Sequence, residues 1–308
     1  MTTLLFTHPS CIEHDPGAGH PERPDRLRAV LAALGAGEFE ALERREAPLA
    51  EIAQIERMHQ ADYVRHVLDA APIEGWLRLE PDTVMSPGSR EAALRAAGGV
   101  CAAVDAVVAG DGKNAFCAVR PPGHHAEHAR AMGFCLFNNV AIAAAQVRAV
   151  HGFGRVAVVD FDVHHGNGTQ HMFEADGDLF FGSTHQYPHY PGSGAAHEQG
   201  VGNIVNVPLA AGDGSAEFRA AMTGTILPAL SAFAPDFILI SAGSDAHADD
   251  PLAMLNFHEN DYAWATTEIS RVADDCCDGR LVSTLEGGYD LGALGRSAAA
   301  HVRALMAA

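Results

Sequence analysis

The sequence has few basic residues, and its cysteines lack the spacing of a paired motif. Each of these features argues against a class of protein. Lys and Arg number 20 against 39 Asp and Glu, a formal net charge of −19, so no binding to nucleic acid through phosphate neutralisation is expected. A basic partner or a cationic substrate fits better, although excess acid also serves solubility. The six cysteines form no CxxC pair, which favours a protein with reduced thiols over a disulfide framework.

Signals for export and for membrane insertion are also lacking. The first eight residues, MTTLLFTH, contain no basic segment and too short an apolar run for a signal peptide. No 18 apolar residues run together without charged or turn residues, so no membrane span is expected and the predicted location is cytoplasmic. Without a Ser/Gly/Pro linker or a repeat of fixed period, the sequence predicts a single domain over residues 1–308 and leaves a homo-oligomer open.

Helical and strand patterns alternate along the chain. Apolar periodicity predicts helices at 23–34, 89–108 and 139–150. Apolar runs with β-branched residues predict buried strands at 115–119, 156–160, 179–183, 204–207, 237–241 and 281–285. Continuous apolar strands separated by helices indicate an α/β fold, with a mainly parallel central sheet flanked by helices on both faces.

Polar residues follow several of these strands at their carboxyl ends, where ligands bind in open α/β sheets. Asp160, Asp162 and His164 end one apolar run at spacings of two, so in an extended segment they share one side. Carboxylate oxygens with an imidazole nitrogen suit zinc or another divalent transition metal. For this cluster alone, a plain polar loop is an alternative of equal weight.

A further carboxylate, Asp245, follows the strand predicted at 237–241. It is expected to complete a set of three protein ligands, which in catalytic zinc sites leaves an open position for water or substrate. The neighbouring Asp249 and Asp250 are instead expected to be solvated or to cap a helix.

Two more strands end in residues that suit catalysis. Pro-Pro-Gly precedes the adjacent His124 and His125, and such a pair suits proton transfer near neutral pH. Tyr289 follows two glycines, which let the backbone carry its hydroxyl into a pocket. Gly-Gly-Tyr by itself indicates little.

Together these segments resemble the histone deacetylase family, in matching order and over nearly the whole chain. The resemblance is carried by HPERPDRL (20–27), RPPGHH (120–125), GFCLFNN (133–139), VDFDVHHGNG (159–168), SAGSDAHADDPL (241–252) and LEGGYD (285–290). HHGNG, DAHADDPL and LEGGYDL are similar to class II members and their bacterial relatives.

The resemblance implies one zinc ion per chain, with Asp162, His164 and Asp245 as its ligands. It also implies that Tyr289 polarises the substrate carbonyl opposite the metal and that His125 is the general base and acid.

Further roles in catalysis follow from the same resemblance. Asp160 would hold His124, which acts through orientation and charge. Asn167 stands where class I members carry an aspartate behind the second histidine, so a less basic His125 is expected.

Substrate-binding residues are implied in the same way. Arg26 matches the arginine at the internal foot of the pocket, near the departing acetate. Phe134 and Tyr190 match the two aromatic walls of the acyl-lysine tunnel, with Gly133 and Leu252 beside them. The family more often has phenylalanine at the second wall, which leaves the fine substrate preference open.

A structural potassium ion is also implied. Main-chain carbonyls match the family's potassium site at Asp160, Asp162, His164, Ser183 and Thr184, with Phe173 in the region of a second site.

The implied function is a zinc-dependent amide hydrolase that removes acetyl or related acyl groups from lysine side chains or similar amines. An acetylpolyamine or other small-molecule amidohydrolase is the alternative, although Leu252 stands where polyamine-specific relatives have a glutamate; an acid from another loop would serve the same purpose. An arginase with two manganese ions is disfavoured because its extra aspartates are absent. A catalytically silent module that reads acyl-lysine is disfavoured because Tyr289, both histidines and all three ligands are intact.

Overall fold

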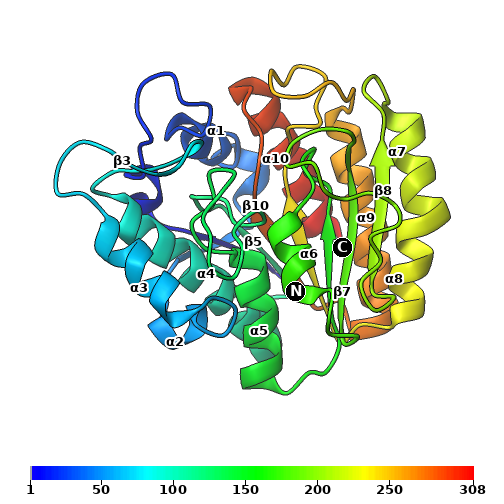
Figure 1. Cartoon of the computed structure of the whole chain (residues 1–308). Coiled ribbons are helices and arrows are strands. Elements are labelled where there is room, and N and C mark those ends of the chain that lie inside the picture. The colour runs from blue at the N-terminus through cyan, green and yellow to red at the C-terminus, as the bar shows by residue number, and fades with distance from the viewer. Residues whose placement is uncertain (1) are drawn as a thin grey trace.

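Parallel strands form the centre of the fold. The computed structural model describes residues 2–308 and contains an eight-stranded sheet in the order β2-β1-β5-β10-β9-β6-β7-β8. All neighbouring pairs are parallel, which confirms the predicted α/β class (Figure 1). The strands are β1 (Thr3–Thr7), β2 (Glu43–Glu46), β5 (Asn114–Cys117), β6 (Val156–Asp160), β7 (Leu179–Gln186), β8 (Ile204–Leu209), β9 (Phe237–Ala242) and β10 (Leu281–Leu285).

Helices cover both faces of this sheet. α4 (Ser89–Ala109) and α5 (Asn139–His151) pack on one face, whereas α1 (Asp25–Ala33), α9 (Glu259–Cys277) and α10 (Leu291–Ala307) cover the other. The shorter helices are α2 (Ile52–Ile55), α3 (Ala61–Ala70), α6 (Asn167–Phe173), α7 (Ser215–Ala221) and α8 (Leu227–Phe233), the last two joined by a π-helical segment (Met222–Ile226). Two 3₁₀ turns (Pro9–Ile12 and Gly37–Phe39) and a separate hairpin of β3 (Leu77–Glu80) and β4 (Thr83–Met85) complete the fold.

The apolar runs identified most of the sheet but not its β1–β2 edge. The strands predicted at 156–160 and 281–285 coincide with β6 and β10. β2 has the sequence Glu-Arg-Arg-Glu and largely exposed side chains, as edge strands often do. It therefore contains no apolar run from which a strand could be predicted.

α4 is more apolar than the sequence analysis recognised. By length and composition it could cross a membrane, but 67% of its most apolar window is buried inside the fold. Gly98 brings this helix close to the preceding segment, since a Cβ there would lie 2.2 Å from the carbonyl oxygen of Pro48. Packing against the sheet and α5 accounts for the apolar composition of α4.

A fully buried ionic cluster fixes α1 to the loop that follows β5. Glu22 accepts hydrogen bonds from Arg120 Nε at 2.5 Å and Nη2 at 2.6 Å, and from Arg26 Nη1 at 3.0 Å. All three side chains are inaccessible to solvent. Burial opposes ionisation of Glu22, but Arg120 and His14 hold the pKa of its carboxyl well below the usual range. Glu22 is therefore the anion that compensates two buried guanidinium groups.

Replacing Glu22 with alanine is expected to lower the free energy of unfolding by about 3–5 kcal/mol, because it leaves buried cations uncompensated. Asp62→Ala is the matched control, since Asp62 pairs with Arg65 on the exposed surface of α3 and such pairs contribute about 0–1 kcal/mol. Urea denaturation measures both values. Equal losses in the two variants would contradict the assigned role of Glu22.

Candidate metal centre and active site

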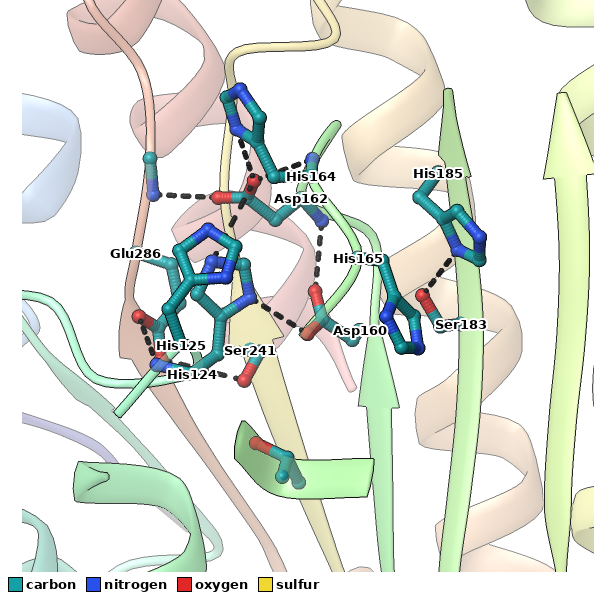
Figure 2. A network of polar contacts seen from close by, with 12 residues as sticks. His124, His125, Asp160, Asp162, His164, His165, Ser183, His185, Ser241 and Glu286 are labelled. Carbon is teal, nitrogen blue, oxygen red and sulfur yellow. Dashed lines mark hydrogen bonds and ion pairs between the residues drawn. The ribbon is translucent and has the colours of Figure 1, made fainter. Parts of the chain in front are cut away.

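Four adjacent strands bring the polar segments together. β5, β10, β9 and β6 are consecutive in the sheet, and because they are parallel, their carboxyl ends meet at one edge. The loops after them carry His124 and His125, Tyr289, Asp245, and the pair Asp162 and His164. Figure 2 shows the two histidines from the β5 loop facing the acidic segment that follows β6.

Asp162, His164 and Asp245 form a buried group with the geometry of a metal site. One ligand atom from each residue lies within 4.8 Å of the others. His164 Nδ1 is 3.0 Å from Asp245 Oδ2 and 3.2 Å from Asp162 Oδ1. One nitrogen and two carboxylates are a donor set that divalent zinc accepts, with a position left open.

The surrounding backbone holds both carboxylates in place. Gly287 N donates to Asp162 Oδ2 at 2.8 Å, and Val163 N donates to Asp245 Oδ1 at 2.9 Å. A Cβ at Gly287 would lie 2.0 Å from Asp245 Oδ2, and one at Gly243 would lie 2.0 Å from Asp162 Oδ2. Burial and the neighbouring Asp162 raise the pKa of Asp245. Two buried carboxylates so close together favour a cation, so the residues present fit a divalent metal.

His124 is held as an acid-paired imidazole. Its Nδ1 lies 2.9 Å from Asp160 Oδ2, as the resemblance predicted (Figure 2). Burial works against protonation, but Asp162 and Asp160 overcome it and raise the pKa of His124 to about 10. The His124 ring lies close to His125, with 4.0 Å between ring centroids and an angle of 46° between the ring planes.

In the part of the chain that the structure describes, only Nδ1 of the His125 ring has a hydrogen-bond partner. Its Nδ1 lies 2.8 Å from Asn167 Oδ1, and the Asn167 amide nitrogen donates to Glu127 and to the His125 carbonyl. These contacts assign a proton to Nδ1 and leave Nε2 free to accept one. Burial, followed by the charges of His124 and His164, lowers the pKa of His125 well below its usual value. Burial is therefore the main cause of the lowered pKa, whereas the hydrogen bond to Asn167 raises it; the effect of asparagine in place of aspartate at this position stays a prediction.

A pocket of about 220 Å³ leads to this centre. The rings of Phe134 and Tyr289 meet edge to face at 5.9 Å, and Tyr190 meets His125 at 5.2 Å. The structure brings every predicted wall residue together in one lining, which is Gly133, Phe134, Tyr190, Leu252, Tyr289, His125, His164 and, in addition, Asp82.

Histidines anchor the loop that carries Tyr190. His165 Nδ1 lies 2.8 Å from Ser193 Oγ, and its ring packs on His185 with 4.7 Å between centroids. His189 stacks on His164 at 5.2 Å, and its Nε2 lies 3.1 Å from the Leu252 carbonyl. The loop that carries Tyr190 is thus joined to the metal-ligand segment at His164 and to the loop that carries Leu252.

Arg26 lies under the tyrosine loop. Its Nε and Nη2 each donate at 2.5 Å, to the carbonyls of Gly288 and Glu286. Its guanidinium carbon is 4.8 Å from the centroid of the Tyr289 ring. Contact with a departing acetate remains a prediction.

The predicted potassium carbonyls come from two paired strands and the segment after one of them. Asp160 is in register with Ser183 on β7, next to Thr184, while Asp162 and His164 follow β6. Potassium at these carbonyls, or near Phe173, remains a prediction.

Two buried acids were not recognised in the sequence. Glu286 is inaccessible to solvent, and its Oε2 accepts from the N–H groups of Gly123 at 2.7 Å and His124 at 3.2 Å. The expectation that Asp250 is solvated is wrong, because it is 7% exposed; it accepts from the main-chain N–H groups of Tyr289 and of Asp290, the residue before α10, on a loop far from it in the chain. The adjacent Asp249 is 58% exposed and pairs with Arg296, as expected. Sequence pattern alone does not tell such neighbours apart.

Comparisons with known proteins agree with this arrangement. The model of the histone deacetylase domain matches residues 20–305. The histone deacetylase-like amidohydrolase of Pseudomonas aeruginosa is 40% identical over 90% of this chain and 74% of that protein. A probable deacetylase of Archaeoglobus fulgidus is 38% identical over 94% of this chain and 82% of its own length. The crystal structure of the HDA15 HD domain superposes with a TM-score of 0.93 at 35% identity, covering 99% of this chain and 88% of that one.

The fold and the buried site thus define a deacetylase-type hydrolase. The chain belongs to the histone deacetylase family.

Proposed function

We propose that this protein is a zinc-dependent deacetylase or deacylase that removes acetyl or related acyl groups from lysine side chains or similar amines. The observation that carries the proposal is the meeting of Asp162, His164 and Asp245 with His125 and Tyr289 at one edge of the sheet. A zinc ion at the three ligands would supply Lewis acidity, which acidifies water and polarises an amide carbonyl.

The two histidines have different roles in this proposal: His125 transfers protons and His124 contributes positive charge. His125 Nε2, unprotonated and facing the pocket, accepts a proton from the attacking water and later returns one to the leaving amine. His124 stays positively charged against Asp160, and so steadies the negative charge that develops beside it.

Tyr289 and the pocket walls orient the substrate. The Tyr289 hydroxyl donates a hydrogen bond to the carbonyl oxygen as it becomes negative. Phe134 and Tyr190 flank an extended acylated side chain, while Gly133 and Leu252 line the entry. Arg26 supports the tyrosine loop from below. The proposal includes a structural potassium ion at main-chain carbonyls at the end of β6, in the segment after it and on β7.

Acetylpolyamine hydrolysis is the second candidate, and one observation favours it. Leu252 supplies no negative charge at the rim, but Asp82 lines the same pocket from the β3–β4 hairpin. A carboxylate there is positioned to attract a remote ammonium group. Asp82 is the kind of acid from another loop that this alternative requires.

Metal analysis tests the centre directly. About one zinc per chain is expected for a three-ligand catalytic site, and Gly287→Ala is expected to lose most of it, because the new Cβ would lie 2.0 Å from Asp245 Oδ2. Gly224→Ala is the control, since a Cβ there meets nothing within 4 Å. A requirement for two manganese ions would support an arginase-like enzyme instead.

Tyr289→Phe is expected to lower turnover of an acetyl-lysine peptide by about 10² to 10³. The phenyl ring keeps the packing against Phe134, and the metal ligands are untouched. Zinc content and thermal stability should therefore equal those of the parent. Parent turnover in this variant would show that the assigned mechanism is wrong.

A substrate panel separates the two candidates. Acetyl-lysine peptides are expected to give a higher kcat/KM than acetylpolyamines. The panel should include longer acyl groups and simple amides, to define the preference set by the tunnel. The reverse order, together with a loss in Asp82→Asn confined to polyamines, would establish the second candidate.

A further inference from the structure

Asp250 connects two loops of the active site through a single carboxylate. Its Oδ2 accepts from Tyr289 N at 2.6 Å and from Asp290 N at 3.2 Å. Its Oδ1 accepts from Leu252 N at 3.0 Å. The loop after β9 is thereby joined to the loop after β10, and both loops supply pocket residues. The side chain is 7% exposed, so water is a poor substitute for these contacts.

The tyrosine loop needs such an anchor. Gly288 has φ of +126°, a left-handed conformation, and two glycines before Tyr289 provide no side chains to fix the segment. Asp290 is the N-cap of α10, with its own carboxylate accepting from Ala293 N at 2.8 Å. N–H groups at a helix start lack intrahelical partners and favour a nearby anion. Asp250 provides the acceptor oxygen at the residue that carries the hydroxyl.

The Asp250 side chain has no other assigned role in the site. It is outside the three-ligand group, and its three hydrogen bonds are all to main-chain N–H groups. A residue that acts on the reaction only through the backbone of another is a positioning residue. An error of about 1 Å in such a placement can cost about 10²-fold in rate.

We propose that Asp250 is a positioning residue for the reaction, which fixes the Tyr289 hydroxyl above the metal centre by holding the Tyr289 and Asp290 N–H groups. This inference rests on the proposed function, because it requires that Tyr289 assist the reaction. Its contact to Leu252 sets the rim of the pocket at the same time.

The test uses the zinc-loaded, full-length protein and an acetyl-lysine peptide. Asp250→Ala is expected to lower kcat by about 10- to 100-fold at parent zinc content, with a smaller change in KM through Leu252. Asp249→Ala is the matched control, because that neighbour is 58% exposed; its carboxylate pairs with the exposed Arg296 at 3.0 Å and lies 3.7 Å from Nδ1 of the buried His247. It should stay within about twofold of the parent, as surface substitutions usually do. Loss of zinc from Asp250→Ala would overturn the inference and assign the residue to the metal centre.

A double-mutant cycle with Tyr289→Phe decides whether the effect passes through the tyrosine. Independent sites give additive effects, whereas coupled residues do not. Without a hydroxyl to misplace, Asp250→Ala in the Tyr289→Phe background should cost less than about threefold in kcat. An equal fold-loss in both backgrounds would overturn the inference.

Asp250→Asn covers the case in which the alanine variant does not fold. Its single amide oxygen can still accept from Tyr289 N, but its NH₂ group must then face another N–H. Asp250→Asn is expected to lose less kcat than Asp250→Ala. In the Tyr289→Phe background, Asp250→Asn should cause no further loss of kcat. Parent kcat in Asp250→Asn would also overturn the inference.

The parent and Tyr289→Phe proteins separate this inference from the proposed function. An inactive parent, or a fully active Tyr289→Phe, contradicts the proposed function. An active parent, an impaired Tyr289→Phe and an additive Asp250→Ala contradict only the role of Asp250.

Discussion

The close approach of two buried carboxylates, Asp162 and Asp245, is the constraint on which the site depends. Each is inaccessible or nearly so, and each lies at the carboxyl end of one of two adjacent strands. Their approach is possible because Gly243 and Gly287 have no side chains, since a Cβ at either would collide with a carboxylate oxygen. Negative charge concentrated in this way favours a divalent cation. Burial lowers the pKa of His124, but Asp162, together with Asp160, raises it to about 10.

The fold compensates its other buried acids in different ways. Glu22 faces two guanidinium groups, a solution that joins α1 to the β5 loop. Glu286 and Asp250 instead accept from main-chain N–H groups. An acid that binds backbone fixes the path of a loop without placing a cation beside the reaction. Glu286 thereby holds the loop of the paired histidines, and Asp250 holds the loop of the tyrosine.

The pocket is assembled from loops that contact one another. His189 links the Tyr190 loop to Leu252 and stacks on a ligand histidine. Asp82 arrives from the β3–β4 hairpin, outside the central sheet, and its Oδ1 accepts from Gly133 N at 3.2 Å. The walls of the pocket are therefore placed by contacts between loops, while the metal-ligand segment and the histidine pair are placed by the strand ends.

The sequence by itself determined the α/β class, most of the strands and the residues that meet at the strand ends. Continuous apolar runs mark strands buried on both faces, and spacings of two after β6 place Asp162 and His164 on one side. The pairing of His124 with Asp160, which the family resemblance implied, is a contact that the structure contains. The roles implied for Arg26 and for the potassium carbonyls stay predictions.

Only the tertiary structure decided the burial and the contacts of residues that lie outside the hydrophobic pattern of the helices and strands. Asp249 and Asp250 are identical neighbours in sequence, yet one is exposed and the other buried. The difference arises because N–H groups just before α10 lie beside Asp250, and the second of them, that of Asp290, is 40 residues further along the chain. The order of the strands likewise places Glu286 beside the β5 loop, and Asp82 reaches the pocket from the separate β3–β4 hairpin. Such contacts depend on which segments meet in space, and local sequence carries no physical record of that.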